Sequence, residues 1–593
     1  MSTFLSCLRA RNSYTTVANK YSQLFLLLQQ LLIIGHYLRG LVILGKGQEA
    51  ENAFARVAIM PLIRSKLSMG RLDQGGSRGE CAGLPSLLQD ILGSIGTTFG
   101  PVLRLSESIF DREVDLVTAG VWVPIATALM ADAGVKMAIF SPGIASILQQ
   151  NYVALDTFLS ELATRLLLKE DDATKQQGGE ESLEQLYYGP AIGAEAIARA
   201  QARVYSHAKT AEFTKRWNLP IYYQLRFGDS CTRLNTAIER TQKEGWIANV
   251  YGGPEEELEK LRTQYGFDLP LFVEVYGILS SFWTSNVFLR PLTHRFLRGA
   301  VQVIGRITTF VDDGLEGKIH FGEERKPIKE EHGLGAINGN GESVLEGRRD
   351  RPSVITRDPY KWGDSLEDVA AVAWELTVLE SKLTHEYTET AQRAAIGAGF
   401  SGEEEEEMAA LVKDFLADAA SKIAPLVQKA WNDTIVNLLI TKCSGPLAAV
   451  KGVAATYRMT NRPPPTQASP FVPTILRPLL QFNDEFKRRI PPPIGIRWKM
   501  AVVNTIAERY SVAVEELIAT VQRTEVALQS RRARKTIAGG MSDGEKAKLQ
   551  LYLDYKEFVK SVQAVGVDPL LVDGVSKLRT LTQDAENRQN GNS

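Results

Sequence analysis

The chain has 593 residues, of which 44% are hydrophobic and 23% are charged. A single hydrophobic core stops growing near about 250–300 residues, so this length predicts several helical modules or an extended rod. The 68 Lys and Arg residues nearly balance 69 Asp and Glu residues, which excludes a globally basic surface, and no nucleic-acid partner is expected.

The first notable element is the apolar run Leu24–Ile34, which resembles a signal peptide or a membrane span. The run is interrupted by Gln29 and Gln30 and is followed by His36. A span needs about 20 apolar residues, so we predict an ordinary buried helix here.

Helical periodicity dominates the remaining sequence. Apolar residues recur at spacings of three and four in residues 38–60, 84–92 and 158–168. No alternation at period two is long enough to indicate a sheet. The pattern therefore predicts an all-α fold, arranged as an elongated succession of helical bundles.

Three helix starts are predicted from a Ser followed three residues later by an acid, the pattern of a capping box. The pairs are Ser365 with Asp368, Ser401 with Glu404, and Ser542 with Glu545. The acidic run Glu403–Glu407 could be a special motif, but a helix dipole also favours acids in a first turn. We interpret the run as that first turn.

Composition shifts divide the chain into segments. Residues 314–360 are rich in Gly and charged side chains and poor in large apolar ones, which predicts disorder. The predicted segments are an N-terminal helical rod region at 1–168, an acidic linker with a short helix at 169–210, a middle helical bundle at 211–313, a disordered insertion at 314–360, a helical bundle at 361–490, a C-terminal helical segment at 491–582 and a disordered tail at 583–593.

No catalytic, metal or cofactor motif stands out. Ser77 lies in a Gly-x-Ser-x-Gly match, but no apolar strand precedes it, as a hydrolase would require. The four cysteines are far apart and the six histidines form no metal-binding pair. We therefore predict a non-enzymatic protein without a cofactor, in a reducing compartment.

Three segments carry a family resemblance, in the family's order. They are Phe213–Phe227 (FTKRWNLPIYYQLRF), Phe288–Arg298 (FLRPLTHRFLR) and Met541–Asp554 (MSDGEKAKLQLYLD). A weaker match is Tyr457–Asn461. Together they resemble the family of the second subunit of the conserved oligomeric Golgi (COG) complex. The chain shows no match to that family's N-terminal coiled-coil region.

This resemblance implies a structural subunit of a Golgi vesicle-tethering complex that acts in intra-Golgi retrograde transport and Golgi organisation. The implied partners are other COG subunits, those of the same lobe first, and, through the complex, SNAREs, Rab GTPases and golgins. The implied location is the cytoplasm and the cytosolic face of Golgi membranes, with peripheral attachment. The alternative is a helical subunit of another tether, such as an exocyst-like complex.

Two groups within these segments are candidate partner contacts. The aromatic group either locks helices together or forms a partner surface. The basic group, spaced by four residues, is either a solvated helix face or a ridge for an acidic partner or anionic lipid. The candidates are Trp217, Tyr222 and Tyr223 in the first group and Arg290, His294 and Arg298 in the second.

Overall fold

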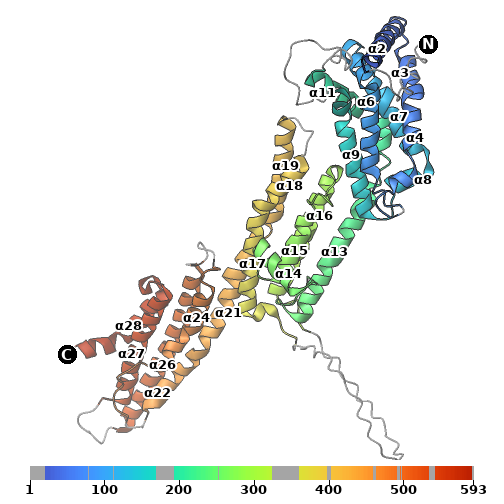
Figure 1. Cartoon of the computed structure of the whole chain (residues 1–593). Coiled ribbons are helices and arrows are strands. Elements are labelled where there is room, and N and C mark those ends of the chain that lie inside the picture. The colour runs from blue at the N-terminus through green and yellow to red at the C-terminus, as the bar shows by residue number, and fades with distance from the viewer. Residues whose placement is uncertain are drawn as a thin grey trace, which may run out of the picture. The chain divides into compact units, whose positions relative to one another are not determined.

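The computed structural model describes residues 20–77, 79–110, 113–168, 192–251, 253–322, 359–396, 402–458, 462–490, 495, 497–532 and 541–590 (Figure 1). Within these ranges every regular element is helical, and the one β pairing is an isolated bridge between Phe321 and Tyr360. The predicted all-α class is confirmed.

The chain divides into two compact units. Unit 1 comprises Met1–Asp229 and Thr284–Arg295, and unit 2 comprises Ser230–Trp283 and Phe296–Ser593. The division falls within α13 (Leu219–Glu244) and within α16 (Thr293–Leu315). Unit 2 takes in residues from five of the predicted segments, 211–313, 314–360, 361–490, 491–582 and 583–593.

Unit 1 is built around α6 and α9, which pack against each other along their lengths. The other helices of the unit surround this pair, with two π-helical turns, η1 and η2, and one 3-10 turn, η3. The elements are α2 (Lys20–Ile43), α3 (Gly47–Phe54), η1 (Ala55–Ile59), α4 (Met60–Lys66), α5 (Met69–Leu72), α6 (Leu84–Phe110), η2 (Leu116–Trp122), α7 (Val123–Ala131), α8 (Ala133–Phe140), α9 (Ala145–Leu167), α11 (Ala194–Ser206), α12 (Ala208–Thr214) and η3 (Arg290–Leu292).

Aromatic side chains fill the core of unit 1. Phe54 and Phe99 meet edge to face with ring centroids 5.5 Å apart. Trp122 is fully buried, and its indole Nε1 donates to Thr210 Oγ1 at 2.7 Å. The indole therefore buries a large apolar area without leaving its one donor unsatisfied.

Unit 2 contains a C-terminal bundle in which α26, α27 and α28 pack on one another. The elements are α14 (Glu255–Tyr265), α15 (Pro270–Ser281), η4 (Trp362–Asp364), α17 (Leu366–Thr384), α18 (Glu386–Ile396), α19 (Gly402–Ser421), α20 (Ala424–Gln428), η5 (Lys429–Ile435), α21 (Val436–Ser444), η6 (Gly445–Lys451), α22 (Gly452–Tyr457), α23 (Val472–Ile475), α24 (Arg477–Phe486), α26 (Arg497–Arg532), α27 (Asp543–Val565), η7 (Pro569–Leu571) and α28 (Asp573–Asn590).

The ends of two predicted disordered segments need correction. Residues 323–358 of the predicted insertion lie outside the described residues, but Phe321 is 0% exposed and pairs with Tyr360 through two backbone hydrogen bonds of 2.7 and 2.8 Å. Phe321 also packs against Trp246 and Trp362. One large ring can offset the polar composition of its neighbours. In the predicted tail at 583–593, α28 continues to Asn590.

The predicted helix caps are found where the structure describes them. Ser542 and Glu545 form the reciprocal capping box at the start of α27. Ser365 caps α17 by accepting from the backbone N–H of Asp368 at 3.3 Å. The predicted cap at Ser401 lies outside the described residues.

Two apolar stretches among the described residues are long enough to cross a membrane. One is the continuous helical stretch Glu403–Tyr457, with 33% of its apolar window buried. The other is the pair Leu116–Ala131 and Ala133–Phe140, bent by 97°. Core helices pass the same test, so neither stretch carries an argument for a span. The predicted helix is confirmed in α2, but its burial holds only in part: Ile34 and Leu38 are buried, whereas Leu32 and Ile33 are exposed.

Candidate functional site

Trp217 lies in the turn between α12 and α13 and packs inside unit 1. Its side chain is 8% exposed, and its ring centroid lies 4.8 Å from that of Phe140 and 5.1 Å from that of Tyr152. Pro220 follows at the second residue of α13, where a helix has no use for its missing N–H. Trp217 therefore fixes the start of α13, and its ring leaves little surface for a partner.

Three side chains of unit 1 hold three consecutive backbone carbonyls. Gln149 Nε2 donates to the carbonyl of Ser285 at 2.5 Å. An Arg226 guanidinium nitrogen donates to the carbonyl of Asn286 at 3.3 Å, and the Tyr222 hydroxyl donates to that of Val287 at 2.5 Å.

These bonds bring two of the family-like segments together. Tyr222 and Arg226 belong to the first segment, and the held carbonyls directly precede Phe288, where the second begins. Tyr222 is 1% exposed, and the Val287 carbonyl accepts the proton of its buried hydroxyl. The aromatic residues of this segment therefore act first as fasteners within the chain.

The remaining predicted contacts lie nearer the surface. Tyr223 is half-buried, stacks on Phe227 with centroids 5.4 Å apart, and has the Arg295 guanidinium 5.9 Å from its ring centroid. The three basic candidates, Arg290, His294 and Arg298, are exposed.

Arg290 has a defined electrostatic neighbour. Burial raises the pKa of Asp156 above its ordinary value, and the positive charge of Arg290 offsets part of that rise. Arg290 therefore helps to stabilise a carboxylate on α9, in addition to presenting charge to solvent.

The other two family-like segments meet in unit 2, around the buried side chain of Asp554. Its carboxylate accepts from the Ser469 backbone N–H at 2.6 Å, from the Ser469 hydroxyl at 2.8 Å and from Gln550 Nε2 at 2.9 Å. Gln550 in turn accepts from the Tyr457 hydroxyl at 2.7 Å and donates to the Gln467 carbonyl at 2.9 Å.

This network fastens a non-helical stretch to α27. Residues 462–468 carry no helix, so their backbone groups need partners from elsewhere. Burial raises the pKa of Asp554, and the hydrogen bonds from Ser469 and Gln550 lower it in part. Asp554 is thus a carboxylate held by neutral donors, with no cation among the partners that bond it.

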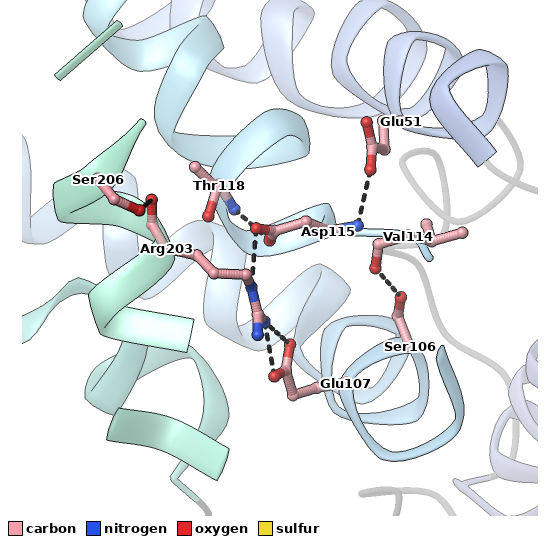
Figure 2. Close-up of polar contacts among 8 residues, drawn as sticks. All are labelled: Glu51, Ser106, Glu107, Val114, Asp115, Thr118, Arg203 and Ser206. Atoms are coloured by element: carbon pink, nitrogen blue, oxygen red, sulfur yellow. Dashed lines mark hydrogen bonds and ion pairs between the residues drawn. The ribbon is translucent and has the colours of Figure 1, made fainter. Parts of the chain in front are cut away.

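An ion triad joins four elements of unit 1 (Figure 2). Arg203 of α11 donates to both carboxylate oxygens of Glu107 on α6 at 2.6 Å and to Asp115 at 3.0 Å. Asp115 caps η2 by accepting from the Thr118 N–H at 2.8 Å, and its own N–H donates to Glu51 of α3 at 2.7 Å.

The triad is buried enough to matter for stability. The Glu107 side chain is 2% exposed and that of Arg203 is 22% exposed. Burial lowers the pKa of Arg203, but the Glu107 hydrogen bond and the Asp115 charge together raise it above its ordinary value. The geometry positions these charges against one another.

The Gly-x-Ser-x-Gly match follows the short helix α5 and not a strand. Ser77 lies in a turn before α6, where its N–H donates to Glu80 at 2.7 Å. Among the described residues, no group of three or more His, Cys, Asp or Glu side chains could hold a metal ion.

The sequence did not reveal four polar residues that bond distant segments of the chain: Gln149, Glu107, Arg203 and Asp554. Glu107 and Asp554 lie within apolar helical stripes, for example between Leu551 and Phe558 for Asp554. A charged residue at a stripe position signals a buried partner. The sequence does not reveal that partner.

Taken as a class, this is an all-helical bundle protein whose most distinctive residues fasten helices and loops to one another. The sequence model of the family described as "COG complex component, COG2, C-terminal" matches residues 215–555. That match covers more than half of the chain, which therefore belongs to the COG2 family.

Relatives carry the same name in several organisms. The chain is 25% identical over 399 residues to human "Conserved oligomeric Golgi complex subunit 2", covering 65% of this chain and 50% of the relative. The subunit 2 of Arabidopsis thaliana is 23% identical, covering 74% of this chain and 50% of the relative. That of Drosophila melanogaster is 21% identical, with shares of 92% and 66%.

The chain thus spans about half the length of the human and Arabidopsis relatives. No solved structure matches the chain.

Proposed function

We propose that this chain is a non-enzymatic scaffold subunit of a Golgi vesicle-tethering complex, acting in intra-Golgi retrograde transport and Golgi organisation. The observation that carries the proposal is the family match over residues 215–555. The relatives in human, Dictyostelium discoideum and Arabidopsis are all named as subunit 2 of the conserved oligomeric Golgi complex.

The packing of the family-like segments supports a scaffolding role. Tyr222 fastens the first pair of segments, and Gln550 fastens the second. Because these residues bond groups 65 and 93 positions away in the chain, they serve to hold distant segments together. Function would then depend on the helix faces that remain exposed.

The proposed partners are other COG subunits, those of the same lobe first, and SNAREs, Rab GTPases and golgins reached through the complex. Attachment to the cytosolic face of Golgi membranes would be peripheral and would depend on these partners. Four of the candidate contacts have side chains accessible to a partner: the exposed Arg290, His294 and Arg298, and the half-buried Tyr223. Trp217 and Tyr222 would act by positioning them.

Affinity purification from cells tests the proposal. The full chain carrying a tag is expressed, recovered under native conditions, and its co-purifying proteins are identified by mass spectrometry. The expected result is recovery of COG subunits. Recovery of exocyst subunits in their place would instead support the alternative tether.

The basic candidates can be tested in the same assay. Arg290→Glu, His294→Glu and Arg298→Glu are combined in one chain, and exposed Lys451→Glu serves as a charge-reversal control outside these segments. Loss of one or more subunits from the triple variant alone would identify a contact surface. An unchanged set of subunits would remove these three residues from the contacts.

A further inference from the structure

One face of helix α19 packs inside unit 2. Val412, Leu416 and Ala419 are at most 1% exposed and face α17 and α18. Gln392 of α18 donates to the Ala409 carbonyl at 2.8 Å, and Figure 1 shows α18 and α19 running side by side. This face accounts for the place of α19 in the fold.

A second apolar row on α19 is left partly exposed by the described residues of unit 2. Leu411 is 55% exposed and Phe415 is 40% exposed, while Met408 is half-buried. Their spacings of three and four place them in one stripe along the helix. Single exposed apolar residues are ordinary, but a stripe on one face is the pattern of a docking surface.

Acidic side chains follow one edge of this stripe. Glu407, Asp414 and Asp418 are exposed, and at 100° per residue they lie on the same flank of Leu411. None of the three forms an ion pair with the part of the chain that the structure describes. The helix holds five Glu and two Asp against a single Lys, Lys413, which falls on the opposite side.

The helix dipole explains only part of this charge. Glu403–Glu405 occupy the first turn, where negative charge is favoured. Asp414 and Asp418 lie in the second half of the helix, and Asp418 is close to the C-terminal end, where the dipole disfavours an acid. The helix dipole therefore does not account for Asp414 and Asp418 beside the stripe.

We infer that this face of α19 docks an amphipathic helix of a partner protein that carries Lys or Arg along one edge of its apolar stripe. Apolar side chains of that helix would cover Met408, Leu411 and Phe415, and its basic edge would meet Glu407, Asp414 and Asp418. An anionic membrane is the wrong occupant, because its surface would repel this edge. The inference deepens the proposed function and rests on it for the origin of the partner.

Fluorescence polarisation with the purified full chain tests the surface directly. The probe is a labelled helical peptide, about 21 residues or six turns long, with Leu at spacings of three and four and Lys along one edge. Its counterpart has Glu in place of Lys. We expect the Lys peptide to bind at least about tenfold more tightly than the Glu peptide and to weaken as salt increases.

Variants separate the two parts of the surface. Leu411→Ala with Phe415→Ala should weaken binding of the Lys peptide at least about tenfold, and Asp414→Lys with Asp418→Lys should reverse the preference between the peptides. Lys413→Glu and Val512→Ala, at exposed positions outside the surface, should leave binding unchanged. Unchanged thermal unfolding midpoints confirm folding, and Asp414→Asn with Asp418→Asn replaces the charge reversal if that variant fails to fold.

Three results would overturn the inference. The first is equal binding of the Lys peptide and the Glu peptide. Binding to phosphatidylserine vesicles that depends on Leu411 and Phe415 is another. The third is a photocrosslinker at position 411 joining residues of unit 1 in the same molecule.

The peptide assay and the affinity purification fail independently. Peptide binding without co-purifying COG subunits would contradict the proposed Golgi function but would still support the docking surface on α19. Co-purifying COG subunits without peptide binding would support the proposed function and contradict the docking surface.

Discussion

Units 1 and 2 each bury a carboxylate at a junction of several elements, but they neutralise it differently. In unit 1, Glu107 faces the guanidinium of Arg203, a full positive charge. In unit 2, Asp554 is bonded by a backbone N–H, a hydroxyl and an amide. The first junction depends on a charge pair and the second on hydrogen bonds to neutral donors.

This difference predicts how each junction responds to substitution. Removing one member of a buried ion pair leaves the other as an uncompensated charge. A carboxylate among neutral donors can be replaced by a neutral group of the same shape at a smaller cost. The two junctions should therefore differ in stability loss and in sensitivity to pH.

The largest effect should come from Arg203→Met. Glu107 would lose its bidentate partner while remaining buried, which should lower the free energy of unfolding by about 3–5 kcal/mol. Urea unfolding followed by circular dichroism measures the change. Arg165→Met, which removes an exposed pair with Glu161, is the matched control and should cost about 0.5 kcal/mol or less. Equal losses in the two variants would remove the distinction drawn above.

Glu375 extends the comparison to pH, because it too is a buried acid bonded by neutral donors. It is 1% exposed and accepts from the Asp268 N–H at 2.8 Å, at the start of α15. Burial raises its pKa from 4.5 to about 8. The folded state thus keeps a proton that the unfolded state releases, so stability should fall as pH rises from about 4.5 to 8.

Glu375→Gln should remove that part of the slope, about 3–4 kcal/mol between about pH 5 and pH 8. Burial also raises the pKa of Glu274 and of Asp554, so the wild-type slope contains their contributions as well. Comparing urea midpoints of variant and wild type at several pH values isolates Glu375. Parallel pH profiles would show that its proton does not contribute.

Asp554→Asn should cost less than Arg203→Met, about 1–2 kcal/mol. The Asn carbonyl oxygen can still accept from Ser469 and Gln550, and the Ser469 hydroxyl can rotate to accept from the new amide. Thermal unfolding measures the shift, with Asp554→Ala as the reference that removes every acceptor. A loss for the Asn variant as large as for the Ala variant would show that the negative charge itself is required.

The smallest effect is expected for Tyr222→Phe. The ring stays buried, and the hydroxyl's bonds to the Val287 carbonyl and with Arg226 are lost, so the expected cost is about 0.5–1.5 kcal/mol. Hydrogen exchange at residues 284–289 should accelerate in the same variant. An unchanged exchange rate there would mean that Gln149 and Arg226 hold the segment without Tyr222.

The fold class could be predicted from the sequence because helix signals are local. The spacing of apolar residues and the Ser542–Glu545 capping box lie within a few residues of each other and correspond to α27 as found. The family-like segments are also visible in the sequence, since each is contiguous.

The buried polar contacts of Arg203 and Asp554 could not be predicted, because their partners are far away in the sequence. Arg203 is separated from Glu107 by 96 positions and Asp554 from Ser469 by 85, and no local pattern pairs them. Composition places Phe321 in a disordered segment because it averages over a window of neighbours. Burial depends instead on the single ring and on the Trp246 and Trp362 side chains that receive it.

The three carbonyls held at Ser285, Asn286 and Val287 have a consequence for dissecting the protein. A fragment ending at residue 229 would keep Gln149, Tyr222 and Arg226 but would lack the backbone carbonyls of residues 285–287 to which they donate. Buried donors would then face solvent or one another, and such a fragment should express as a destabilised, aggregation-prone species. A piece intended to behave like the native N-terminal unit must carry residues 284–295 as well.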